Sequence, residues 1–218
     1  MTGSRASFTS YDTLMSDAQH SRRGDDTSSH RSAHALGRTD FGDVGEVTKH
    51  DSRLSAFGAC EEANVAVGTA LAFGDFEVEI AGTLTSVQND LFDLAADLSV
   101  PFDESDEPDV VRITEQHLTW VDRAYEHYSA QLTPIEGYIL PGGTVPAALL
   151  YQARVAVRRA ERATLAAMAE FPESTNVLVP RYLNSASSLI FVLARTHNSE
   201  LGDTMWNPLG SVTARPQN

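Results

Sequence analysis

Three arginines and a glutamate stand at helical spacing within residues 154–162, which read RVAVRRAER. Arg154, Arg158, Glu161 and Arg162 follow at i, i+4, i+7 and i+8, so a helix would carry them on one face. Guanidinium groups bind phosphate oxygens through paired hydrogen bonds, and one interpretation is therefore a pocket for a polyanion. The alternative is a surface ladder of ion pairs, and this segment alone does not decide between the two.

The helix that carries these side chains is expected to run from Val145 to about Glu170, because Pro172 lies just beyond its end. Apolar residues at spacings of three and four predict four more helices. These cover residues 51–71, residues 76–100, a segment that starts at Thr114, and a segment from Val179 or Arg181 to His197. The glycine-containing residues 37–49 read as a loop, and no alternating strand pattern of useful length is present. The predicted fold is all-α, an antiparallel up-and-down bundle of five helices.

The chain divides by composition into three parts. Residues 1–35 have few large apolar side chains, so a disordered N-terminal tail is predicted there. Residues 36–207 are expected to form the helical bundle domain, and residues 208–218 a loose C-terminal tail.

The overall charge argues against several classes of protein. There are 30 acidic and 16 basic residues, and a net charge of −14 lacks the basic footprint of a nucleic-acid-binding protein. No apolar run reaches membrane-spanning length, and the N-terminus lacks the apolar core of a signal peptide. The single cysteine, Cys60, excludes an intrachain disulfide and a cysteine-based zinc site, which is compatible with the cytoplasm.

Other chemistries find little support in the sequence. The Glu-x-x-His pairs of di-iron bundles are absent, as are phosphate-binding glycine motifs, and no metal ligands are predicted. Asn64 and Asn184 fall among apolar residues, where a hydrogen-bonded core amide is a more frequent explanation than a ligand contact. The apolar patch at residues 138–140 lies in a proline- and glycine-rich connection, where it either lines a site or covers the core.

Five segments together resemble the PduO-type corrinoid adenosyltransferases over roughly residues 37–207. The matching segments are residues 49–64 (KHDSRLSAFG and EEAN), 88–98 (QNDLFDLAADL), 138–143 (YILPGG), 154–162 (RVAVRRAER), and 181–195 (RYLN and FVLAR). The resemblance implies a homotrimer with active sites between subunits. It also implies transfer of the 5′-deoxyadenosyl group of ATP to cob(I)alamin, with Mg²⁺ as a further requirement and release of triphosphate. The resemblance further implies a cobalamin reductase or a B12-dependent enzyme as a protein partner.

The resemblance also implies roles for individual residues. Tyr138 stands where the family usually has the Phe that keeps the lower axial ligand off cobalt. Glu61 stands where the family has an Asp paired across the subunit interface with Arg154. The residues implied in binding ATP are Gly37, Thr39, Lys49, Arg158, Arg159, Glu161, Arg162 and Asn184.

Two stretches depart from the family pattern. The N-terminal ATP loop T-G-D-x-G-x-T becomes AHALGRT at residues 33–39, which keeps only Gly37 and Thr39. In the last helix, L-N-R-L-S-D becomes LNSASS at residues 183–188, so that a charge pair is replaced by hydroxyls. Two alternatives to an active adenosyltransferase follow: a catalytically impaired corrinoid-binding carrier or regulator, and a purely structural trimeric bundle.

Overall fold

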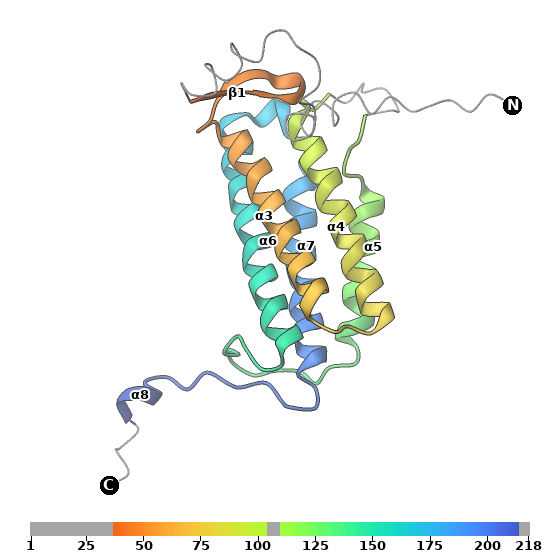
Figure 1. Ribbon diagram of the computed structural model, residues 1–218, viewed down its shortest axis with the longest axis vertical. Helices are drawn as coiled ribbons and strands as arrows, with labels where there is room; N and C mark the ends of the chain where they lie inside the picture. The colour runs from red at the N-terminus through yellow and green to blue at the C-terminus, as the bar shows by residue number, and fades with distance from the viewer. Residues whose placement is uncertain (1–36, 104–109, 214–218) are drawn as a thin grey trace, which may run out of the picture.

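Five long helices run up and down the molecule in the structure, a computed structural model that describes residues 37–103 and 110–213 (Figure 1). They are α3 (Ser52–Phe73), α4 (Val78–Ser99), α5 (Glu115–Ser129), α6 (Val145–Glu170) and α7 (Leu178–His197). The predicted five-helix bundle is therefore confirmed. Apolar periodicity located the helices to within a few residues of their observed bounds, because the periodic apolar residues form the face that each helix buries.

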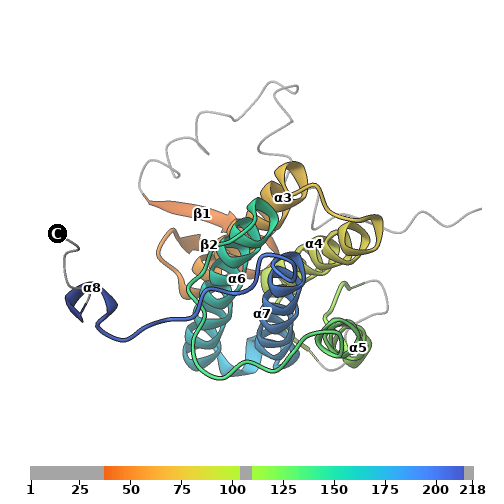
Figure 2. The same cartoon turned by 90° about the horizontal axis from the view of Figure 1, so that it is seen from below.

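The helices pack as neighbours around one apolar core (Figure 2). α3 packs against α4 and α6, α6 packs against α7, and α5 lies against the other side of α7. The leucine-rich series predicted on residues 76–100 faces inward, and its members are at most 6% exposed: Ile80, Leu84, Val87, Leu91, Leu94 and Leu98. Burial of this stripe fixes the rotation of α4 and, with it, the side chains on the remaining faces.

A small β-hairpin at one end of the bundle corrects the loop predicted over residues 37–49 (Figure 1). Strand β1 (Arg38–Phe41) pairs antiparallel with β2 (Gly45–Thr48), and η1 (Gly42–Val44) forms the turn between them. Phe41 is fully buried, with its ring edge-on to Phe57 at 5.5 Å between centroids. Two strands of four residues are too short to show alternation in sequence, which is why the pattern was missed.

The ends of α6 fix the helix relative to the hairpin. Thr144 caps its first turn by accepting a hydrogen bond from the Ala147 N–H, with a proline in the first turn. At the other end, the Ser52 hydroxyl donates to the Glu170 carboxylate over 2.6 Å, which joins the end of α6 to the start of α3. α6 therefore runs from the α5–α6 connection to the hairpin end of the bundle.

The two predicted tails fall largely outside the described residues. Residues 1–36, which include the predicted disordered tail, and residues 214–218 are not described. Within the predicted C-terminal tail, α8 (Gly210–Thr213) forms one helical turn. Elsewhere in the chain, η2 (Pro172–Ser174) connects α6 to α7. The domain boundaries at residues 35 and 207 remain predictions. Over residues 37–103 and 110–213, no helix combines the length and apolar character needed to cross a bilayer.

Candidate functional site

The arginines of α6 do not form one continuous ladder. Arg158 lies 3.9 Å from Glu161 along the helix, whereas Arg159 turns to α3 and forms an ion pair with Glu62. Arg154 sits over the Phe191 ring of α7, with 5.2 Å from its guanidinium carbon to the ring centroid. The helix therefore presents guanidinium groups in two directions, toward α7 and toward α3.

The surroundings of Arg154 disfavour its positive charge. Its Nε is buried and finds no hydrogen-bond partner among the described residues. Burial, followed by the proximity of Arg158, lowers the pKa of the Arg154 guanidinium below its ordinary value. On α3, burial raises the pKa of the Glu61 carboxyl. Arg154 and Glu61 make no ion pair with each other within the described part of one chain.

A groove of about 680 Å³ lies along the surface between α3 and α6. Its lining combines two cations with small and apolar side chains, which suits a ligand with both charged and apolar parts. The lining residues are Glu62, Val65, Ala66, Thr69, Pro141, Ala148, Tyr151, Gln152, Val155, Ala156, Arg159 and Arg162. Arg159 and Arg162 thus line the same concave surface.

Tyr151 is a residue of this groove that sequence reasoning missed. Its side chain is 6% exposed, and its hydroxyl has no hydrogen-bond partner among the described residues. Burial raises the pKa of the Tyr151 phenol above its ordinary value. Its position one turn before Arg154 was the only available signal, because a tyrosine on a buried helix face is usually read as core.

The hairpin brings two predicted nucleotide-binding residues together. The backbone N–H of Lys49 donates to the carbonyl of Gly37 over 2.8 Å, which closes the open end of the hairpin. Gly37 has φ of 76°, a conformation that side chains disfavour. Thr39 lies two residues after Gly37, in β1 opposite Val47. These residues lie at the hairpin end of the bundle, where α6 also ends.

The two asparagines differ in setting. Asn64 is buried, donates to the Gln88 carbonyl over 2.9 Å and accepts from the Gln88 amide over 2.8 Å. It is the core amide that the sequence suggested. Asn184 is exposed on α7, which corrects the expectation of a buried amide and leaves its side chain free to meet a ligand. Its backbone carbonyl accepts hydrogen bonds from the hydroxyls of Ser187 and Ser188.

Tyr138 belongs to the connection between α5 and α6. This connection lies at the end of the bundle opposite the hairpin (Figure 1). The side chain is 75% exposed, and its ring meets Trp206 edge-on at 5.9 Å between centroids. Its backbone carbonyl accepts the Trp206 N–H over 2.7 Å. Trp206 could not be identified from the sequence, because the contact joins residues 68 positions apart through an irregular segment.

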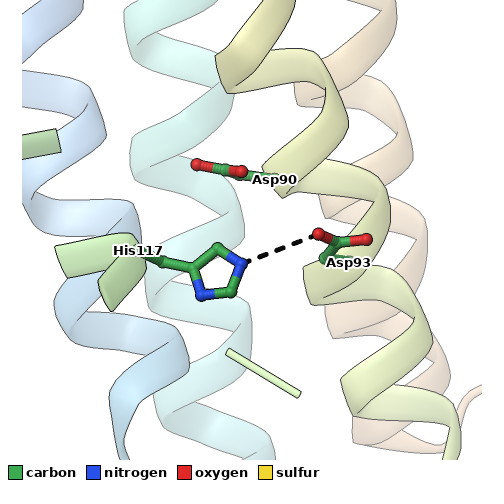
Figure 3. A group of neighbouring side chains, drawn as sticks. All are labelled: Asp90, Asp93 and His117. Atoms are coloured by element: carbon green, nitrogen blue, oxygen red, sulfur yellow. Dashed lines mark ion pairs between the residues drawn. The ribbon is translucent and has the colours of Figure 1, made fainter. Parts of the chain in front are cut away.

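A cluster of Asp90 and Asp93 from α4 with His117 from α5 has the residue types of a metal site (Figure 3). His117 Nδ1 accepts the backbone N–H of Thr114 over 3.1 Å, so the neutral ring carries its proton on Nε2. That nitrogen lies 3.7 Å from Asp93, and the Tyr182 hydroxyl donates to Asp90 over 2.6 Å. A hydrogen bond therefore joins α7 to α4, and the longer His117–Asp93 contact joins α5 to α4. A neutral His117 that bound a metal through Nε2 would need its proton on Nδ1, which would break the bond from the Thr114 N–H at the helix cap.

Cys60 is equally unsuited to chemistry. Its thiol is buried in the core, and burial raises its pKa to about 12. A thiol with this pKa is almost fully protonated near neutral pH and is a poor nucleophile.

The structure thus defines a class of protein: a five-helix bundle with a cationic central helix, an adjoining groove and an exposed aromatic loop. The family model for cobalamin adenosyltransferase matches residues 35–197. A corrinoid adenosyltransferase of Mycobacterium tuberculosis is 40% identical over 195 residues, which cover 89% of this chain and 95% of that protein. The chain belongs to the cobalamin adenosyltransferase family.

More distant relatives agree in sequence and in fold. A corrinoid adenosyltransferase of Bacillus subtilis is 34% identical over 167 residues, covering 73% of this chain and 81% of that protein. A variant PduO-type ATP:corrinoid adenosyltransferase from Lactobacillus reuteri, solved with cobalamin and ATP, superposes with a TM-score of 0.70 at 29% identity. That match covers 79% of this chain and 96% of the other. The predicted family is confirmed.

Proposed function

We propose that this protein transfers the 5′-deoxyadenosyl group of ATP to cob(I)alamin, forming adenosylcobalamin and triphosphate. The observation that carries the proposal is the half-buried Arg154, whose Nε has no hydrogen-bond partner among the described residues. Three further arginines follow it on α6 and add to the positive charge of the site. A protein retains a poorly solvated cation of this kind when another charged group completes its surroundings. Membership of the cobalamin adenosyltransferase family indicates which reaction such a site catalyses.

The reaction creates negative charge that the arginines can stabilise. A bond forms between cobalt and the ribose C5′, the C5′–O bond breaks, and both of its electrons leave with the triphosphate. Guanidinium groups positioned before the reaction lower the energy of this charge as it develops. Arg158, Arg159 and Arg162 are proposed to contact the phosphate oxygens, and Glu161, 3.9 Å from Arg158, to orient that arginine.

The hairpin and α7 are proposed to complete the nucleotide site. Gly37 and Thr39 would approach the nucleotide through β1, Lys49 would contact a phosphate, and the exposed Asn184 would contact ATP. The acids nearest the arginines are already engaged, Glu62 with Arg159 and Glu161 with Arg158. We therefore propose that Mg²⁺ arrives with ATP and is held mainly by phosphate oxygens, its usual arrangement in nucleotide sites.

Tyr138 is proposed to face the lower side of the corrin ring. The carbon face of its exposed aromatic ring offers an apolar surface without a donor atom, in place of the displaced lower ligand. Loss of that ligand leaves a four-coordinate Co(II), which is easier to reduce to the attacking Co(I). The phenol hydroxyl distinguishes this residue from the Phe usual in the family.

A homotrimer is proposed as the active assembly, with Glu61 of one subunit paired to Arg154 of the next. Glu61 and Arg154 have no ion pair with each other inside one chain, and an intersubunit pair would neutralise both. The buried lone thiol Cys60 suits a reducing cytoplasm, where a cobalamin reductase would supply electrons.

Incubation of purified protein with ATP, Mg²⁺ and chemically reduced cobalamin tests the proposal. The expected result is conversion of the cob(I)alamin spectrum to that of adenosylcobalamin, at a rate that depends on ATP. Two altered stretches near the nucleotide, residues 33–39 and 183–188, motivate the alternative of an impaired corrinoid carrier. Corrinoid binding with neither ATP binding nor product would establish that alternative instead.

A further inference from the structure

Two buried polar side chains at the end of α7 hold the connection that carries Tyr138. Arg195 is 8% exposed and Asn198 is 2% exposed, and both face the segment that follows α7 rather than the bundle core. Burying a guanidinium and an amide is costly unless their hydrogen bonds are made. The hydrogen-bond partners of Arg195 and Asn198 therefore indicate the structural role of these two side chains.

Arg195 joins the start of the connection to the segment after α7. Its Nε donates to the Asp203 carboxylate over 2.8 Å, and its Nη2 donates to the backbone carbonyl of Thr133 over 2.9 Å. Both side chains of the Arg195–Asp203 pair are largely buried, at 9% and 12% exposure. A charge-assisted bond in this setting is among the stronger ones in proteins.

Asn198 holds the other end of the same connection. Its Oδ1 accepts the Thr144 backbone N–H over 3.0 Å, and its Nδ2 donates to the Gly142 carbonyl over 3.0 Å. A Cβ at Gly143 would collide with the Asn198 side chain, so glycine is needed there for the close approach. We call Arg195, Asn198 and Asp203 the C-terminal latch.

The segment beyond the latch pairs with the Tyr138 loop itself. Leu140 N–H donates to the Thr204 carbonyl over 2.8 Å, and the Trp206 N–H donates to the Tyr138 carbonyl over 2.7 Å. Ile139 and Met205 form an antiparallel bridge between these two bonds. Figure 2 shows the segment after α7 crossing this end of the bundle. The Tyr138 backbone is therefore fixed on both sides, while its exposed ring has Trp206 as an aromatic neighbour.

We propose that Asp203, through the C-terminal latch, is a positioning residue that sets where Tyr138 meets the corrin. This inference rests on the proposed function. Of the three latch side chains, only the Asp203 carboxylate bonds to the side chains of both others, since it accepts from Arg195 and, at 3.5 Å, from Asn198. Loss of its charge weakens the attachment of the segment that carries Trp206 to α7, so that the backbone bonds to Tyr138 and Leu140 hold the loop to a less firmly anchored segment.

The test uses the full-length protein with Asp203→Asn, an isosteric change, and Asp203→Glu as the charge-retaining control. Electron paramagnetic resonance of Co(II)-cobalamin with ATP measures the ratio of four- to five-coordinate cobalt. Asp203→Asn is expected to lower that ratio about tenfold, the scale of one charge-assisted hydrogen bond. ATP affinity by calorimetry should stay within about twofold, because the nucleotide residues are separate from the latch. Asp203→Glu should recover much of the ratio.

A wild-type ratio in Asp203→Asn would overturn the proposal, as would a parallel loss of ATP affinity. Should Asp203→Asn not fold, Trp206→Ala decides, with Trp206→Phe as its control. Trp206→Ala keeps the backbone bond to Tyr138 and removes only the half-exposed ring, so an unchanged ratio would equally count against positioning. Wild-type protein that produced no four-coordinate cobalt would instead contradict the proposed function.

Discussion

The substitution Arg158→Ala tests whether Arg158 binds a phosphate of ATP or is only a surface residue of α6. Within the chain, Arg158 has its carboxylate neighbour Glu161 at 3.9 Å, and its side chain is 42% exposed. A pair this long and this exposed contributes about 0–1 kcal/mol to stability, so the fold should survive its removal. A charged hydrogen bond to ATP is worth about 1.5–3 kcal/mol, and its loss should raise the Kd for ATP by roughly 12- to 160-fold.

Isothermal titration at fixed Mg²⁺ and ionic strength measures this change. Arg123→Ala is the matched control, because Arg123 is exposed on α5, a helix that packs against α7 and carries none of the proposed site residues. Its Kd should match that of the wild type. Equal affinities for Arg158→Ala and the wild type, with an unchanged unfolding midpoint, would remove Arg158 from the phosphate site and weaken the argument built on α6.

Three further predictions concern stability. Asp97 is 2% exposed and accepts hydrogen bonds from the Arg112 guanidinium and the Ile113 N–H, so Asp97→Ala should cost about 3–5 kcal/mol in urea unfolding. A loss below 1 kcal/mol would show that this buried pair contributes little. Leu84 is fully buried, and Leu84→Ala should cost about 2–5 kcal/mol by the same assay, while a near-zero change would argue against the core position of α4. Burial lowers the pKa of His197 below the ordinary value of a histidine, so the unfolded chain binds the proton more readily and the fold loses stability as pH falls through that ordinary value. His197→Phe should therefore lose less stability than the wild type between pH 7 and pH 5, and parallel pH profiles would contradict this.

Periodic features were predictable from the sequence because one repeated physical requirement produces them. The series that includes Leu84 and Leu91 marks the buried face of α4 wherever the other helices lie. The arginines of α6 were likewise visible, since their spacing alone puts Arg154 and Arg158 on one face. The direction of Arg159 toward Glu62 was not, because it depends on how α3 packs against α6.

Features that depend on contacts between distant segments were missed. The bond between Asn198 and the Thr144 N–H spans 54 residues, and Trp206 meets Tyr138 through a segment without regular structure. No local period encodes such contacts, so Asp203 and Trp206 looked like ordinary loop residues. Family resemblance located Tyr138 but not the side chains that hold its loop.

The central claim is that the arginines of α6 stabilise a triphosphate leaving group, and the phosphorus products of a single turnover test it most directly. Phosphorus NMR of enzyme mixed with ATP, Mg²⁺ and cob(I)alamin should show intact triphosphate, in a one-to-one ratio with adenosylcobalamin. Appearance of ADP and phosphate without adenosylcobalamin would mean that the bond cleaved lies between phosphates rather than at C5′, and would contradict the account.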